Sequence, residues 1–253
     1  MPRTARIKSE SGTYHIIMRG INRQILFEDE EDCTKFIQVL KRYKDICEYK
    51  VYAYCLMDNH LHLLLREGKE PLETVMRRIC GSYVFWYNKK YDRIGYLFQD
   101  RFKSEPVEDD VYFLAALRYI FQNPIKAGIT NRVKNYKWTN YNDYIKGNKL
   151  TDTAFVLDII NATNREDAVK SFIEYINKEN GDACMDISEK RQLTDTEAMK
   201  IIKECCKVEH GKDLQKQETD QRNLYLRKLK ALNLSIRQIE RLTGISRGII
   251  QKL

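Results

Sequence analysis

Two strand-like segments separated by only two residues constrain the fold of this chain most strongly. Residues 50–57 and 60–66 are both rich in apolar and β-prone side chains, and Asp58-Asn59 between them is typical of a tight turn. This pattern predicts an antiparallel hairpin. Because a lone hairpin is at best marginally stable in water, further strands or helices must cover it, and we expect an antiparallel sheet.

The segments around this hairpin alternate between strand-like and helix-like patterns. The strand-like stretches are residues 13–18, 96–98 and 102–107, and the helix-like stretches are residues 29–49, 71–90 and 108–124. The resulting order, β-α-β-β-α-β-α, predicts an α+β fold of the split β-α-β type. We therefore expect a ferredoxin-like antiparallel sheet with helices on one face, followed by an all-α C-terminal region.

Changes in composition suggest three parts. The polar stretch around residues 140–152 reads as a linker, only helical patterns follow it, and residues 181–192 form a second plausible break. We predict an α+β domain over residues 1–148, a helical connector over 149–193, and a helical domain over 194–253.

The overall charge indicates the class of partner. The chain of 253 residues has a formal net charge of +8, which favours polyanions such as nucleic acids. It has seven cysteines, an odd number without a C-x-x-C pair, so we expect a reducing cytoplasmic location rather than a disulfide framework or cysteine-rich zinc site. No apolar run approaches the length of a membrane helix, about 18 residues, and no secretory signal is recognisable.

A pair of histidines lies in the second strand of the hairpin. Alternate strand residues point to the same side of a sheet, so His60 and His62 are expected to face one way. Two neutral imidazoles so placed can hold one divalent ion, together with an oxygen ligand and water. The alternative is a pair of hydrogen-bonded histidines without a metal. His15, on the first strand, is expected to be a partly buried, hydrogen-bonded histidine.

A tyrosine and an asparagine share one face of the helix that ends near Pro124. Asn123 follows Tyr119 by four residues, a spacing that aligns side chains on a helix. The phenol offers a nucleophile, and the amide oxygen offers a third metal ligand. The alternative is that Tyr119 belongs to the core and Asn123 satisfies the helix end. The residues alone leave both possibilities open.

Three motifs in this order carry a family resemblance, and they span residues 58–64, 99–104 and 118–128. Together with residues 14–24, they resemble the HUH-type single-tyrosine transposases, specifically the REP-associated tyrosine transposase branch. The resemblance covers roughly residues 8 to 145. It implies a metal-dependent catalytic domain, over residues 1–148, that cleaves and rejoins single-stranded DNA at hairpin-forming ends.

The resemblance also implies roles for individual residues. His60 and His62 match the metal-binding pair of the family, and Tyr119 matches the nucleophile that forms a 5′-phosphotyrosine. Asn123 falls where related transposases carry a polar third ligand, often the longer glutamine. Mg²⁺ or Mn²⁺ is the expected ion, because the reaction handles phosphate oxygens. A non-catalytic DNA-binding regulator and a metal-dependent nuclease without a covalent intermediate are the alternatives.

Basic residues near these motifs are candidates for binding the DNA backbone. They are Arg19, Arg23, Arg101 and Lys103. The alternative is ordinary surface charge.

The C-terminal residues 234–250 are typical of a helix-turn-helix. Ser235 and Ser246 suit the starts of its two helices, and Gly244 permits the turn between them. Arg237 and Arg247 are candidates for phosphate contacts beside a recognition helix. From about residue 194 the chain resembles the C-terminal DNA-binding domain of the replication initiator DnaA, which implies recognition of duplex or hairpin DNA. A helical pair that only packs or forms a homodimer is the alternative.

Overall fold

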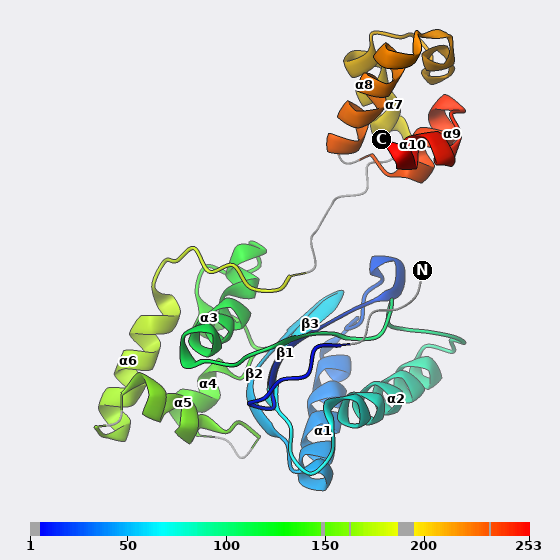
Figure 1. Ribbon diagram of the computed structural model, residues 1–253. Coiled ribbons are helices and arrows are strands. Elements are labelled where there is room, and N and C mark those ends of the chain that lie inside the picture. The colour runs from blue at the N-terminus through cyan, green and yellow to red at the C-terminus, as the bar shows by residue number, and fades with distance from the viewer. Residues whose placement is uncertain (1–5, 148–149, 162, 187–194, 233) are drawn as a thin grey trace. The chain divides into compact units, whose positions relative to one another are not determined.

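The computed structural model describes residues 6–147, 150–161, 163–186, 195–232 and 234–253. The chain forms two compact units, Met1–Asp186 and Ile187–Leu253 (Figure 1). In its described part no helix is long and apolar enough to cross a membrane.

The first unit is built on a four-stranded antiparallel sheet in the order β2-β3-β1-β4. The strands are β1 (Thr13–Arg19), β2 (Lys50–Met57), β3 (His60–Arg66) and β4 (Lys103–Pro106). Strands β2 and β3 form the predicted hairpin, since Met57 pairs with His60 across Asp58 and Asn59. The α+β prediction is confirmed.

Two long helices cover one face of the sheet, α1 (Glu30–Cys47) and α2 (Leu72–Lys90) (Figure 1). A capping box begins α1: the Asp29 carboxylate accepts a hydrogen bond from the Asp32 backbone, and Asp32 reciprocates. Both helices bury their apolar sides against strand residues such as Leu61 and Leu63.

Helix α3 (Asp110–Lys126) covers the opposite face, so the expectation of helices on one face is too narrow. The physical reason is that β3 is apolar on both sides. Leu61 and Leu63 pack in the layer of α1 and α2, whereas Leu64 packs against residues of α3. Leaving either face in water would expose a large apolar surface.

Three further helices extend the α3 layer: α4 (Tyr141–Lys146), α5 (Thr153–Ile160) and α6 (Arg165–Asn177). Two short 3₁₀ helices, η1 (Ile21–Arg23) and η2 (Val133–Asn135), complete the elements of the first unit. Phe172 of α6 stacks on Tyr144 of α4, with ring centroids 4.3 Å apart. Because α5 and α6 share the α3 core, the first compact unit extends past residue 148, where the predicted catalytic domain ends.

The second unit contains only helices, as expected for the C-terminal region. They are α7 (Asp195–Cys206), η3 (Gly211–Lys216), α8 (Thr219–Ala231), α9 (Ile236–Thr243) and α10 (Arg247–Lys252). The Ser235 hydroxyl caps α9 by accepting a hydrogen bond from the Gln238 backbone at 3.1 Å, and Gly244 ends it with a left-handed φ of 73°. Ser246 precedes α10 without a side-chain capping bond.

Candidate active site

Three histidines gather on the sheet face that α3 covers. In the β1–β3 register, Ile17 lies opposite His62 and His15 lies opposite Leu64. Residues directly opposite in an antiparallel pair point to the same side, and side chains alternate along each strand. His15, His60 and His62 therefore all project toward α3.

The imidazole of His62 is fully buried between two partners. Its Nδ1 lies 3.2 Å from Nε2 of His15, and its Nε2 lies 3.1 Å from the amide nitrogen of Asn123. A half-turn of that amide exchanges its nitrogen and oxygen, and would bring Oδ1 to the same place. His15, expected to be a partly buried histidine, is in fact fully buried and hydrogen-bonded to His62.

His60 is half-buried at the start of β3, with its ring centroid 5.3 Å from that of His62. Its Nδ1 lies 2.8 Å from Oδ1 of Asn59. Because a carbonyl oxygen only accepts, this contact places the proton on Nδ1 and the lone pair on Nε2. The neighbouring asparagine thus selects the tautomer in which Nε2 can act as a ligand.

Burial keeps the paired imidazoles neutral. Loss of solvation lowers the pKa of His15 to about 4. It also lowers the pKa of His62 well below its usual value, and the nearby His15, His60 and Lys126 lower it further. Both rings are therefore neutral near pH 7, the state that binds a metal ion.

Tyr119 lies against this cluster from α3. Its ring centroid is 5.8 Å from that of His62 and 6.0 Å from that of His15, and the residue is only 5% exposed. The four-residue spacing places Tyr119 and Asn123 on one helical face, as predicted, and that face is turned toward the histidines. The structure therefore brings together the phenol, the two imidazoles and the amide that the sequence singled out.

Two charged residues near Tyr119 were missed by the sequence reasoning. The Nζ atom of Lys126 lies 4.1 Å from the centre of the Tyr119 ring, a cation–π contact. The Tyr119 hydroxyl is hydrogen-bonded to the Asp186 carboxylate, which accepts the bond; burial, followed by this bond, raises the pKa of Tyr119 well above its usual range. Lys126 could have been found from its spacing, because it follows Tyr119 by two helical turns. No pattern in the sequence pointed to Asp186.

Asp186 reaches the site because the segment 178–186 lies along α3. The Arg118 guanidinium donates two hydrogen bonds to the Asp182 carboxylate, at 2.7 and 2.8 Å. Next to it, the Asn180 amide donates to the Gln122 side chain at 2.8 Å. The backbone N–H of Met185 donates to Glu105 of β4 at 3.2 Å. These bonds hold the segment beside the phenol.

The predicted DNA-binding residues of the first unit lie in different surroundings. Arg19 is opposite His60, and Lys103 is opposite Ile17, so both project on the histidine side of the sheet. Arg23 ends η1, and Arg101 is exposed in the loop before β4. The sheet thus places two of these four residues on the face of the candidate site.

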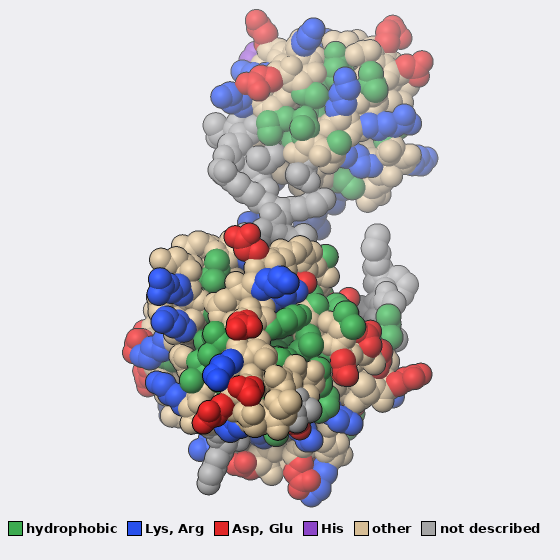
Figure 2. All heavy atoms as spheres, turned by 90° about the vertical axis from the view of Figure 1, so that its left-hand side faces the viewer, with side chains coloured by type: hydrophobic (Ala, Val, Ile, Leu, Met, Phe, Trp, Pro, Cys, Tyr) green, Lys and Arg blue, Asp and Glu red, His purple; other side chains and the backbone are tan. Residues whose placement is uncertain are grey.

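The other two predicted DNA-binding residues belong to the second unit. Arg237 is exposed on α9, and Arg247 at the start of α10 forms an ion pair with Glu240. In Figure 2, Lys and Arg side chains are spread over the visible surface of this unit.

The chemistry of the cluster fits a divalent ion. It offers two imidazole nitrogens and one amide oxygen, a set suited to Mn²⁺ and, with additional oxygen ligands, to Mg²⁺. Among the described residues, no group of three His, Cys, Asp or Glu side chains is placed to hold a metal. The amide of Asn123 and oxygens from the substrate or water would therefore be needed to complete the coordination.

Comparison with known proteins finds relatives of the first unit. Residues 8–123 match the model of a family described as IS200-like transposases. The chain is 28% identical over 119 residues to a Haemophilus influenzae protein that carries the name REP-associated tyrosine transposase, with 41% of this chain and 67% of that protein covered.

A solved structure of a REP-associated tyrosine transposase bound to a REP hairpin has the same fold. Its TM-score is 0.50 at 16% identity, over 58% of this chain and 86% of that chain. The region that matches the family model, residues 8–123, contains every strand of the sheet and most of α3, including Tyr119 and Asn123. Over residues 8–123, this chain is therefore similar to the IS200-like transposases.

Proposed function

We propose that the chain is a metal-dependent transposase that nicks and rejoins single-stranded DNA at hairpin-forming ends, through a 5′-phosphotyrosine on Tyr119. The proximity of the buried Tyr119 phenol to the two imidazoles and the Asn123 amide carries this proposal. The similar structure with a bound REP hairpin supports hairpin DNA as the substrate class.

The proposed metal ligands are Nε2 of His60, Nε2 of His62 and Oδ1 of Asn123. A bound Mg²⁺ or Mn²⁺ would supply polarisation of the scissile phosphate and neutralisation of its charge in the transition state. Two neighbours orient the rings: Asn59 binds Nδ1 of His60, and His15 binds Nδ1 of His62. Partners of this kind fix the tautomer and the direction of a metal ligand.

The reaction begins at the Tyr119 hydroxyl. Its oxygen forms a bond to phosphorus as the bond between phosphorus and the 3′-oxygen breaks, and the departing oxygen takes a proton from water. The phenol proton passes to the Asp186 carboxylate, which already accepts its hydrogen bond. The cation of Lys126 over the ring favours the developing phenolate.

The covalent product explains rejoining. Cleavage leaves a 5′-phosphotyrosine and a free 3′-hydroxyl, and the energy of the phosphodiester is kept in the new bond. Attack by another 3′-hydroxyl reverses the step, returns the proton to Tyr119 and joins a new strand. No nucleotide cofactor is required.

For the second unit we propose recognition of duplex or hairpin DNA by α9 and α10. Between residues 221 and 253 the basic side chains are Arg222, Arg227, Lys228, Lys230, Arg237, Arg241, Arg247 and Lys252, and Glu240 is the one acidic residue. This excess of positive charge suits contacts to phosphates.

Incubation of a labelled single-stranded hairpin DNA with the protein and Mg²⁺, followed by a denaturing gel, tests the proposal. We expect a covalent adduct that Tyr119→Phe abolishes, because this change removes the nucleophile and keeps the ring. Tyr43→Phe is the matched control: Tyr43 is partly buried in the α1 and α2 layer and should leave the adduct unchanged. Binding without cleavage would favour a regulator, and cleavage that survives Tyr119→Phe would favour a nuclease without a covalent intermediate.

A further inference from the structure

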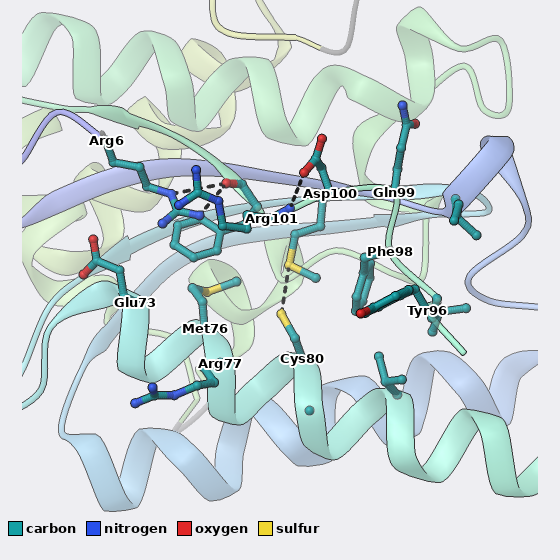
Figure 3. A pocket seen from close by; sticks show the side chains of 16 residues that line it. Arg6, Glu73, Met76, Arg77, Cys80, Tyr96, Phe98, Gln99, Asp100 and Arg101 are labelled. Carbon is teal, nitrogen blue, oxygen red and sulfur yellow. Dashed lines mark hydrogen bonds between the residues drawn. The ribbon is translucent and has the colours of Figure 1, made fainter. Parts of the chain in front are cut away.

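A second site candidate lies on the other side of the sheet, the side that α2 covers. It is a pocket of about 810 Å³, walled by α2 and by residues 96–102 (Figure 3). This volume falls within the range of small-ligand sites, about 300–1,000 Å³. None of the proposed metal ligands, nor Tyr119, lines it.

The pocket combines flat apolar surfaces with arginines. Phe98 and Phe102 line the pocket together with Met76 and Cys80. Figure 3 shows Met76 and Cys80 on α2 and Phe98 on the segment beside it. Tyr96, also in the lining, is 85% exposed. Exposed aromatic side chains are the surfaces on which unpaired bases stack.

Charge at the pocket fits a nucleotide. Its charged lining residues are Arg6, Arg77, Arg101, Glu73 and Asp100, three positive and two negative. The Arg6 guanidinium lies 3.7 Å above the Phe102 ring and donates to the Phe102 carbonyl oxygen at 3.2 Å. A fixed arginine over an aromatic ring offers one plane for stacking and one cation for a phosphate.

Gly81 leaves open space at the α2 wall of the pocket. It lies inside α2 and lines the pocket, yet a Cβ added there would meet no atom of the described residues within 4 Å. Glycine inside a helix costs about 1 kcal/mol relative to alanine. With no side chain and no neighbour in contact there, Gly81 leaves room for a bound molecule to approach α2.

The pocket and the candidate active site share one edge of the sheet. Phe98 pairs with Gly20, and the backbone N–H of Gln99 donates to the carbonyl oxygen of Arg19 at 2.8 Å. Arg19 is itself opposite His60 in the sheet. On the other flank, Phe102 lines the pocket while the next residue, Lys103, projects on the histidine side. A DNA strand bound at Tyr119 has a short path around this edge.

We propose that the pocket holds an unpaired base of the same DNA strand that is cleaved at Tyr119, stacked between residues 96–102 and α2. This inference rests on the proposed function, because it takes single-stranded DNA as the substrate. The base would set which phosphate of the strand reaches the phenol.

Filling the pocket from Gly81 tests this directly, since a Cβ added there meets no neighbouring atom within 4 Å. Gly81→Phe should weaken binding of a hairpin with single-stranded flanks of random sequence by about tenfold or more, the loss expected for one stacked base. Gly81→Ala should cause a smaller loss. Gln38→Phe adds the same ring at an exposed position of α1 and should leave binding unchanged. Tryptophan fluorescence verifies that each variant is folded.

Photocrosslinking identifies where the base lies. With 5-iodouracil in the flanks, we expect crosslinks to Tyr96, Phe98 or Phe102 in the unmodified chain, and their loss in Gly81→Phe. Unchanged affinity of Gly81→Phe, or crosslinks only outside this pocket, would overturn the inference. The adduct assay distinguishes the two proposals. An adduct at Tyr119 without crosslinks in the pocket would overturn only the base pocket. Crosslinks in the pocket without an adduct would overturn only the cleavage mechanism.

Discussion

The Nε2 atom of His15 lies 3.2 Å from the Nδ1 atom of His62, and both residues are fully buried. This contact links the first strand of the sheet to the proposed metal ligand on the third. It positions the His62 ring so that Nε2 faces Asn123 on α3. The buried pair has consequences for stability as well as for metal binding.

The first prediction is a loss of stability in acid. The pKa of His15 is 6.5 in the unfolded chain and about 4 when folded, so the unfolded state binds the proton first as the pH falls. The contribution of His15 to the free energy of unfolding is therefore fully present above pH 6.5 and decreases as the pH falls toward 4. For this residue we expect the free energy of unfolding to fall by about 2 kcal/mol between pH 7 and pH 5.

Urea unfolding with EDTA at both pH values measures this effect. The two tryptophans of the chain, Trp86 and Trp138, both belong to the first unit, so their fluorescence reports on that unit alone. His15→Phe removes the titrating group and should reduce the difference between the two pH values by about 2 kcal/mol. An equal pH dependence in the variant would show that His15 is not the cause.

The second prediction concerns the third metal ligand. Asn123→Asp replaces an amide oxygen by a carboxylate, a stronger ligand for Mn²⁺ and Mg²⁺, and should tighten Mn²⁺ binding. Asn123→Leu removes the oxygen and should weaken binding by about 10- to 100-fold. Titration calorimetry with Mn²⁺ measures both changes. Equal affinities of the two variants would remove Asn123 from the coordination sphere.

The third prediction concerns the segment that carries Asp186. The Arg118 and Asp182 side chains form an ion pair and are only 11% and 13% exposed. Asp182→Ala therefore leaves the Arg118 guanidinium without this partner and with little access to water. We expect a loss of about 3 kcal/mol in the free energy of unfolding. Glu30→Ala breaks the exposed pair with Lys137 and should cost under about 1 kcal/mol. Tryptophan fluorescence measures the free energy of unfolding of both variants. Similar losses in the two would contradict this prediction.

The fourth prediction addresses the second unit. If Arg237 contacts a phosphate, Arg237→Ala should reduce the slope of log affinity against log salt by about 1. Lys203→Ala changes an exposed residue of α7 in the same unit and should leave the slope unchanged. Fluorescence anisotropy with duplex DNA over a range of salt concentrations gives both slopes. An unchanged slope for Arg237→Ala would exclude that contact.

Local patterns in the sequence predicted the parts of the site, but not all of their surroundings. Alternation along β3 placed His60 and His62 on one side, and the helical period joined Tyr119 to Asn123. That these two pairs meet was implied only by the family resemblance, because no periodicity says which sheet face a helix covers. The approach of Asp186 depends on how α6 and the segment after it pack on α3, which is a tertiary effect.

Mass spectrometry of the protein–DNA adduct identifies the residue that becomes joined to the DNA. After incubation with hairpin DNA and Mg²⁺, followed by nuclease and protease digestion, we expect a peptide in which Tyr119 carries a 5′-linked nucleotide, and a DNA fragment that ends in a 3′-hydroxyl. A nucleotide attached to another residue, or cleaved DNA without any protein attached, would contradict it.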